Sequence, residues 1–222
     1  MASNPNMALK NRHRVLCAVS GGYKTTAIMK MDELKRARRV IFFDPYGLHK
    51  KIGCRTILQT HSLKAFTLTL HRLMRQKRPF VVSLVGMKGV KALDVFAQII
   101  WHFADGNKET HVVIEELLRC VRSVHSLQDS VKELWQGGRQ FGLIMITLFQ
   151  RAQEVPKSIV NQAHFKWVGQ QDSIRDAEYW SKEIDVPVAD ILALKEGEFY
   201  LKESGQPPQF GTLRRHSSNK NG

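Results

Sequence analysis

Residues 15–26 read Val15-Leu-Cys-Ala-Val-Ser-Gly-Gly-Tyr-Lys-Thr-Thr26, an apolar run followed by a glycine turn and a Lys-Thr pair. The apolar run predicts a short buried strand, and the residues from about Lys24 onward are compatible with a helix. A strand, a glycine turn and a helix in this order are typical of a phosphate-binding P-loop, whose backbone N–H groups surround an anion. We therefore predict a nucleoside triphosphate site at Ser20, Gly21, Gly22, Tyr23, Lys24, Thr25 and Thr26.

Two side chains of this segment have distinct predicted roles. Lys24 adds positive charge beside the phosphates, and the hydroxyl of Thr25 can hold Mg²⁺. The segment departs from the usual G-x-x-x-x-G-K-[ST] pattern because Ala18 replaces the first glycine and Tyr23 the last. Since tyrosine is unfavourable at positive φ, Tyr23 has to avoid that conformation or accept strain. A strand-to-helix turn with a solvated lysine is the alternative interpretation.

Composition narrows the classes of function. The chain has 222 residues, 43% of them hydrophobic, which predicts one globular domain. Its 34 Lys and Arg against 20 Asp and Glu give a formal charge of +14, which indicates a polyanionic partner, most simply nucleic acid. A protein that is merely basic, or one that meets anionic lipid, is also compatible with this charge. No apolar run approaches the ~20 residues that cross a bilayer, and the three scattered cysteines indicate neither a zinc site nor a disulfide framework.

The rest of the chain alternates between apolar runs and helical patterns. Further buried strands are predicted at 40–43, 80–85, 111–114 and 143–148, and Ser62 and Ser126 are predicted N-caps of two intervening helices. This alternation predicts an α/β fold with a mostly parallel sheet flanked by helices on both faces. A short strand at 165–168, a helix over 172–184 and an edge strand at 198–201 follow. The expected division is a flexible leader (1–13), one domain (14–203) and a flexible basic tail (204–222).

An acidic pair ends the predicted fourth strand, in Val112-Val-Ile-Glu-Glu116. The carboxyl end of a parallel strand opens onto the same crevice as the P-loop. A triphosphate site needs a carboxylate on the metal side and a group that polarises the attacking water. We assign the first role to Glu115, together with Thr25 as a metal ligand, and the second to Glu116. Alternatively, the two acids simply begin a solvated helical turn.

Three more polar residues surround the predicted fifth strand. Gln150 at its end can hydrogen-bond the γ-phosphate or the attacking water and report the nucleotide state. Arg139 and Arg151 flank the strand, and either could reach a neighbouring subunit's site as an arginine finger. The alternative for Gln150 is an ordinary loop residue, and most arginines are solvent residues.

Taken together, these segments resemble the FtsK/HerA superfamily of P-loop ATPases, and especially the genome-packaging ATPases of tailless, membrane-containing viruses. The resemblance covers roughly residues 14–202. It rests on the P-loop at Ser20–Thr25, Val-Ile-Phe-Phe-Asp-Pro45, Val-Val-Ile-Glu-Glu116, Gly138-Arg-Gln-Phe-Gly-Leu143 with the strand that ends at Gln150, and Leu194-Lys-Glu-Gly-Glu-Phe-Tyr200. The last of these resembles a late hairpin of the family.

The resemblance implies a RecA-like P-loop NTPase core with a C-terminal edge hairpin, and ATP and Mg²⁺ as cofactors. It also implies a homo-oligomeric ring, a hexamer or a pentamer, that translocates double-stranded DNA. By position, Lys24 and Thr25 take the phosphate and metal roles, Glu115 and Glu116 the acidic roles and Gln150 the sensor role. Ala18, Tyr23 and Glu115 depart from the family pattern.

The expected function is therefore an ATPase that packages a viral genome into a preformed capsid. It would act in the host cytoplasm or at a capsid vertex, docked on a capsid or membrane protein. Two alternatives stay open from the residues. One is another P-loop NTPase such as a small-molecule kinase, although no arginine-rich lid is evident. The other is a basic nucleic-acid-binding module with a decayed P-loop, which Tyr23 favours.

Overall fold

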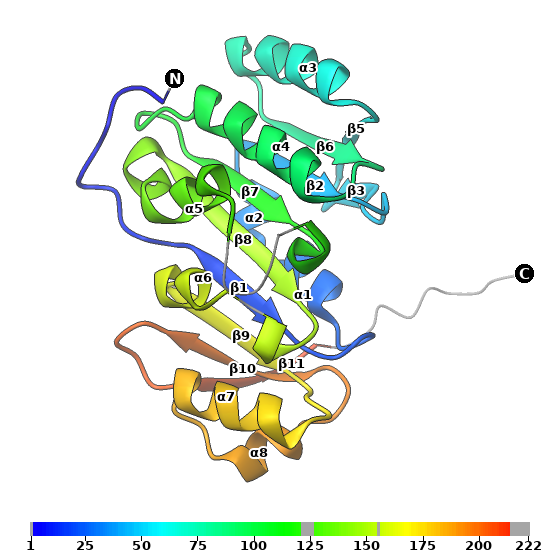
Figure 1. Cartoon of the computed structure of the whole chain (residues 1–222), viewed down its shortest axis with the longest axis vertical. Helices are drawn as coiled ribbons and strands as arrows, with labels where there is room; N and C mark the ends of the chain where they lie inside the picture. The colour runs from blue at the N-terminus through cyan, green and yellow to red at the C-terminus, as the bar shows by residue number, and fades with distance from the viewer. Residues whose placement is uncertain (1, 121–126, 155, 214–222) are drawn as a thin grey trace, which may run out of the picture.

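A nine-stranded sheet forms the centre of the molecule (Figure 1). The structure is a computed structural model, and it describes residues 2–120, 127–154 and 156–213. The strand order is β11-β10-β9-β1-β8-β7-β2-β6-β5, and every pair from β9 to β5 is parallel. Only β10 and β11, at one edge, run antiparallel to their neighbours. The predicted α/β fold with a mostly parallel sheet and an edge hairpin is confirmed.

The central strands are short and buried because their apolar runs face helices on both sides. The nine strands of the sheet, edge strands included, are β1 (Arg14–Cys17), β2 (Arg39–Asp44), β5 (Leu58–Thr60), β6 (Phe80–Val85), β7 (Thr110–Ile114), β8 (Leu143–Phe149), β9 (Phe165–Gly169), β10 (Glu198–Glu203) and β11 (Gln209–Thr212). A separate small hairpin joins β3 (Lys51–Ile52) and β4 (Arg55–Thr56). Successive residues of a strand alternate between faces. Accordingly, Val15 and Cys17 pack in one apolar core and Leu16 and Ala18 in the other.

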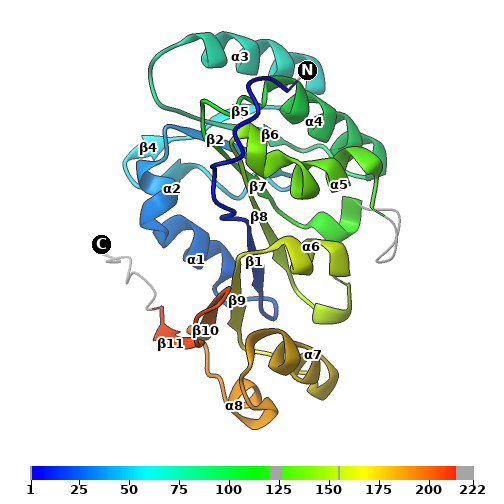
Figure 2. The same cartoon turned by 90° about the vertical axis from the view of Figure 1, so that its left-hand side faces the viewer.

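The helices divide unequally between the two faces (Figure 2). Helices α1 (Lys24–Lys30) and α2 (Asp32–Arg36) cover one face. The other face is covered by α3 (Leu63–Arg75), α4 (Val90–Phe103), α5 (Asp129–Gln136), α6 (Lys157–Gln162), α7 (Ile174–Ile184) and α8 (Val188–Leu192). Short 3-10 turns are η1 (Leu117–Cys120), η2 (Gly138–Phe141) and η3 (Ala152–Glu154). None of the helices within the described residues is both long and apolar enough to span a bilayer.

The predicted helix caps have different outcomes. Ser62 caps α3, because its Oγ accepts a hydrogen bond from the N–H of Ala65 at 3.2 Å. Ser126, the other predicted cap, lies outside the described residues, and α5 begins at Asp129. Its N-cap is Gln128, whose side chain donates to the carbonyls of Val90 and Cys120 instead of capping the helix.

The segment expected to be a flexible leader lies against the amino-terminal edge of the sheet. The N–H of Ser3 donates to the carbonyl of Ala104 at 3.0 Å, and that of Asn6 to Gln140 at 2.7 Å. Asn11 Nδ2 donates to the carbonyl of Gln162 at 2.8 Å. These three acceptors belong to the segments that lead into β7, β8 and β9, so the leader bridges consecutive connections of the sheet.

The expected flexible tail, 204–222, contains an element that sequence patterning did not indicate. Strand β11 pairs with β10 in antiparallel register, with Phe210 opposite Tyr200. A Cβ at position 211 would lie 2.4 Å from the ring of Phe199, so a larger residue there would have to displace that ring. Residues 209–212 therefore belong to the domain, and the basic residues from 214 onward lie outside the described residues.

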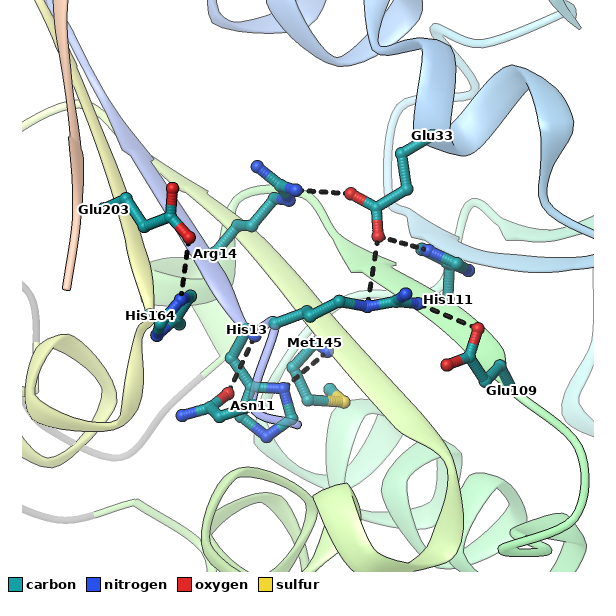
Figure 3. A network of polar contacts seen from close by, with 10 residues as sticks. Asn11, His13, Arg14, Glu33, Glu109, His111, Met145, His164 and Glu203 are labelled. Carbon is teal, nitrogen blue, oxygen red and sulfur yellow. Dashed lines mark hydrogen bonds and ion pairs between the residues drawn. The ribbon is translucent and has the colours of Figure 1, made fainter. Parts of the chain in front are cut away.

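A charged network ties α2 to the amino ends of β1 and β7 (Figure 3). Glu33 on α2 is paired with His111 Nε2 at 3.1 Å, with Arg12 Nε at 3.4 Å and with the guanidinium of Arg14. Burial alone would raise the pKa of Glu33, but His111, Arg14 and Arg12 together lower it to about 2. The single carboxylate of Glu33 thereby links four segments, namely the leader, β1, α2 and β7.

Candidate nucleotide-binding site

The loop between β1 and α1 has the form of an anion cradle. The N–H of Gly22 donates to the carbonyl of Val19 at 2.9 Å, and Gly21 has a φ of 77° that favours glycine. A Cβ on Gly22 would lie 2.7 Å from the Cβ of Ala18 and 2.9 Å from the carbonyl oxygen of Val19. The tight turn therefore requires both glycines, and residues 21–26 line a hollow of about 190 Å³.

Tyr23 is the strained residue of this loop. It stands immediately before α1 with φ 63° and ψ 11°, in the left-handed region. Of the two outcomes open for a tyrosine at this place, the chain has adopted the strained one. Such conformations cost about 1–3 kcal/mol and concentrate at functional sites, where the surrounding structure maintains them.

Lys24 is folded back over the loop at the start of α1. Its Nζ donates to the carbonyl oxygens of Ala18 at 2.6 Å and Val19 at 2.8 Å. Burial lowers the pKa of Lys24, while Cys17, Glu116 and Glu115 oppose the shift electrostatically. The loop and the acidic pair follow β1 and β7, which both pair in parallel with β8, so they lie at the same end of the sheet.

Glu115 follows β7 and is buried, with 4% of its surface exposed. Its Oε1 lies 2.6 Å from Nε2 of His49, which is itself 2% exposed. The loop after β2 holds His49 in place, because its backbone N–H donates to Oδ2 of the buried Asp44 at 3.0 Å. A histidine thus fixes the carboxylate that the sequence assigned to the metal side.

Sequence reasoning did not single out His49. It lies 66 positions before Glu115, in a loop without periodicity, and only the pairing of β2 with β7 brings the two residues together. The nearest sequence signal is Asp44-Pro-Tyr-Gly47, a combination of residues that is typical of a turn. The Asp44 carboxylate does order that turn, since it also accepts from the N–H of Tyr46 at 3.3 Å.

Glu116 and Gln150, predicted from separate strands, are in direct contact. Gln150 Nε2 donates to Oε1 of Glu116 at 2.9 Å. Glu116 has a φ of 51°, so the chain turns sharply between the end of β7 and η1 and presents the carboxylate toward the end of β8. The strand order explains this contact, because β8 lies between β7 and the strand that carries the loop.

The two candidate arginines lie at opposite ends of β8. Arg151 follows the strand and lines a hollow of about 530 Å³ that also includes Val19, Ser20 and Gln150. Arg139 precedes the strand, in η2, and its Nη1 donates to the leader carbonyls of Met7, at 3.1 Å, and Leu9. Within one chain, Arg151 therefore adjoins the loop, whereas Arg139 does not join the other site residues.

The oxygen atoms near the loop suit a magnesium ion bound mainly through phosphates. Thr25 is exposed in the first turn of α1, and the carboxylates of Glu115 and Glu116 act on the adjacent lysine. No group of three or more His, Cys, Asp or Glu side chains within the described residues could hold a metal alone. Mg²⁺ is commonly held by one or two carboxylates together with substrate phosphates.

We compared the chain with known proteins to identify those that share its sequence or its mostly parallel α/β fold. No protein-family model matches the chain. Protein P9 of Pseudoalteromonas phage PM2 is 25% identical over 123 residues, which are 53% of this chain and 56% of that protein. The chain thus matches little more than half the length of this curated relative.

Two solved structures match nearly the whole chain. The genome packaging NTPase B204 of Sulfolobus turreted icosahedral virus 2, in complex with AMPPCP, has a TM-score of 0.73 at 16% identity, covering 92% of this chain and 99% of that one. The plasmid coupling protein TrwB, with a non-hydrolysable GTP analogue, has a TM-score of 0.70 at 10% identity, covering 91% and 85%. Both structures share the fold of this chain, so the P-loop NTPase fold that the sequence resemblance implied is confirmed.

Proposed function

We propose that this chain is a Mg²⁺-dependent ATPase that translocates double-stranded DNA as a homo-oligomeric ring and packages a viral genome. The observation that carries the proposal is the convergence of three segments on one edge of the sheet. Gln150 donates to Glu116 at 2.9 Å and lines, with Val19 and Ser20 of the loop, a hollow of about 530 Å³. Nucleotide-bound neighbours of the same fold support the ATPase part of the proposal.

The residues divide the work of hydrolysis. The loop amides and Lys24 bind the phosphates, and Glu116 polarises the attacking water from the position that Gln150 fixes. When bound, Mg²⁺ neutralises developing phosphate charge, and Thr25 and Glu115 are the residues that would hold it. Because Gln150 contacts both Glu116 and the hollow beside the loop, it can transmit the state of the nucleotide to Arg151 next in the chain.

The DNA part of the proposal rests on charge and on the neighbours. A formal charge of +14 favours a polyanionic partner. B204 is described as a genome packaging NTPase and TrwB as a plasmid coupling protein. A ring would leave Arg139, at the edge opposite the loop, and Arg151 as the candidates for an arginine finger. We further propose the host cytoplasm or a capsid vertex as the place of action, docked on a capsid or membrane protein.

The experiment that tests this proposal is ATP turnover by the full chain with and without duplex DNA. We expect Mg²⁺-dependent phosphate release that duplex DNA stimulates. Lys24→Ala should weaken ATP binding about tenfold or more, because it removes a charged hydrogen-bond donor. Stimulation by a small-molecule acceptor instead of DNA would favour a kinase. Equal and negligible ATP affinity in the parent and in Lys24→Ala would show that the P-loop has decayed. The strained Tyr23 is the observation that favours this alternative.

A further inference from the structure

A second charged site lies at the amino ends of the parallel strands, whereas the nucleotide loop lies at their carboxyl ends. It is a hollow of about 420 Å³ between the segments that lead into β2, β6 and β7. Six of its eight lining residues are basic and none is acidic. We call these six the basic hollow: Arg38, Arg39, Arg75, Lys77, Arg78 and Lys108.

The basic hollow is held in shape by backbone contacts. The guanidinium of Arg38 donates to the carbonyl of Lys77, which joins the segment before β2 to the segment before β6. The N–H of Phe80 donates back to the carbonyl of Arg38 at 2.8 Å, and Arg39 pairs with Phe80 in the β2–β6 register. The cations therefore project from anchored connections, which reduces the entropy that a bound partner would cost.

Few acidic groups offset this charge. Asp105 pairs with Lys108 at 3.1 Å and opposes the burial that lowers the pKa of Arg39. Glu109 lines the adjoining hollow but is bonded to Arg12 at 2.8 Å. Basic residues in the last turns of α2 and α3 complement the helix dipoles there. That explanation covers Arg75 but not the remaining five cations, which lie beyond the helix ends.

The character of the hollow selects the kind of partner. All of its cations except the half-buried Arg39 are exposed, so the site would not enclose a small anion. Its only apolar side chain, Met74, is half-buried, which leaves no anchor for a lipid surface. Exposed cations spread over three connections suit a run of phosphodiester charges.

We propose that the basic hollow is a contact site for the phosphate backbone of duplex DNA, an inference that rests on the proposed function. The nucleotide site and the DNA contact are then at opposite ends of the same strands. Strand β2 runs from Arg39 to Asp44, which orients His49 beside Glu115. Strand β7 begins at Thr110, shortly after Lys108, and ends at Ile114, directly before Glu115. Two rigid strands thus connect the DNA contact to the acidic pair.

The test compares two double variants with the same change in charge. Lys77→Gln/Arg78→Gln removes two exposed cations of the basic hollow. Lys132→Gln/Lys157→Gln removes two exposed cations from α5 and α6. Duplex binding by the full chain is measured by fluorescence anisotropy over a series of salt concentrations, together with ATP turnover with and without duplex.

We expect the first variant to bind duplex roughly tenfold or more weakly than the parent, with the slope of log affinity against log salt reduced by about 2. Its turnover without DNA should be unchanged, and its stimulation by DNA reduced. The control should stay within about twofold of the parent. If the first variant binds as the control does while the parent binds duplex, the inference is wrong and the proposed function stands. If the parent itself neither binds duplex nor responds to it, both are wrong.

Discussion

At the scale of single residues, two strained positions flank the candidate site. Tyr23 and Glu116 both have positive φ, although neither is glycine. Tyr23 ends the loop that would hold the phosphates, and Glu116 is the second residue after β7. Strain of this kind persists only where neighbouring contacts over-determine it. For Glu116 the contact is the hydrogen bond from Gln150, which fixes the carboxylate where a water-polarising group is needed.

Glu116→Gln tests the role of this carboxylate. A glutamine keeps an oxygen that can accept from Gln150, so the local geometry is retained while the negative charge and the basicity are lost. We expect ATP to bind with little change and turnover to fall by about 10²–10⁴-fold, the range for loss of a general base. Phosphate release and equilibrium ATP binding measure the two effects. Glu178→Gln, an exposed change on α7, is the control, and unaltered turnover in Glu116→Gln would refute the assignment.

At the scale of elements, the end of β2 supports the end of β7. His49, in the loop after β2, lies 2.6 Å from the Glu115 carboxylate, and the buried Asp44 orients the histidine backbone. Removing one partner of a buried pair leaves the other without compensation. We therefore regard His49 as a positioning residue for Glu115 and not as a group that touches the nucleotide.

This role predicts different results for two substitutions of His49. His49→Ala should lower turnover about 10–100-fold and raise the Mg²⁺ concentration needed for half-maximal rate, because the ligand carboxylate loses its support. His49→Gln retains an N–H donor and should recover part of both effects. Turnover over a Mg²⁺ titration distinguishes the two, and thermal unfolding checks that both variants are folded. An unchanged Mg²⁺ requirement in His49→Ala would contradict the positioning role.

The same elements show what sequence can predict. The runs at β1, β2, β6, β7 and β8 are apolar on both faces, so periodicity alone places them in a covered parallel sheet. The acidic pair and Gln150 follow their strands directly, and the topology of a parallel sheet brings strand ends together. His49 was missed because its position depends on a loop. Strand β11 was missed because its polar, glycine-containing residues have no apolar alternation.

At the scale of the whole molecule, the buried His13 and the half-buried Glu33 hold the amino-terminal ends of the central strands. His13, next to β1, is 1% exposed and packs edge-on against Trp135, with ring centroids 5.4 Å apart. Its Nδ1 accepts from the N–H of Met145 on β8 at 3.1 Å, which requires that nitrogen to be unprotonated. Glu33 joins the same edge from the helix side (Figure 3). The folded chain favours a neutral His13 and a charged Glu33. Protonation of either group at low pH therefore destabilises the fold.

The acid sensitivity should divide into two pH windows. Burial lowers the pKa of His13 from 6.5 to about 4, so between these values the unfolded chain binds a proton that the folded chain excludes. The contribution of His13 to the free energy of unfolding is fully present above about pH 6.5 and falls by about 3 kcal/mol as the pH drops to 4. Glu33 has its pKa lowered from 4.5 to about 2, so its contribution is present above pH 4.5 and is lost as the pH falls toward 2.

Urea unfolding across this pH range, at constant ionic strength, separates the two groups. His13→Gln cannot be protonated but retains an oxygen that can accept from Met145, so the loss of stability between pH 6.5 and 4 should flatten. Glu33→Gln removes the paired charge, so it should lower stability at neutral pH and flatten the loss below pH 4.5. His61→Gln, at an exposed position, is the control and should leave both windows as in the parent. If His13→Gln loses stability between pH 6.5 and 4 as steeply as the parent, the burial of a neutral imidazole does not set the upper window.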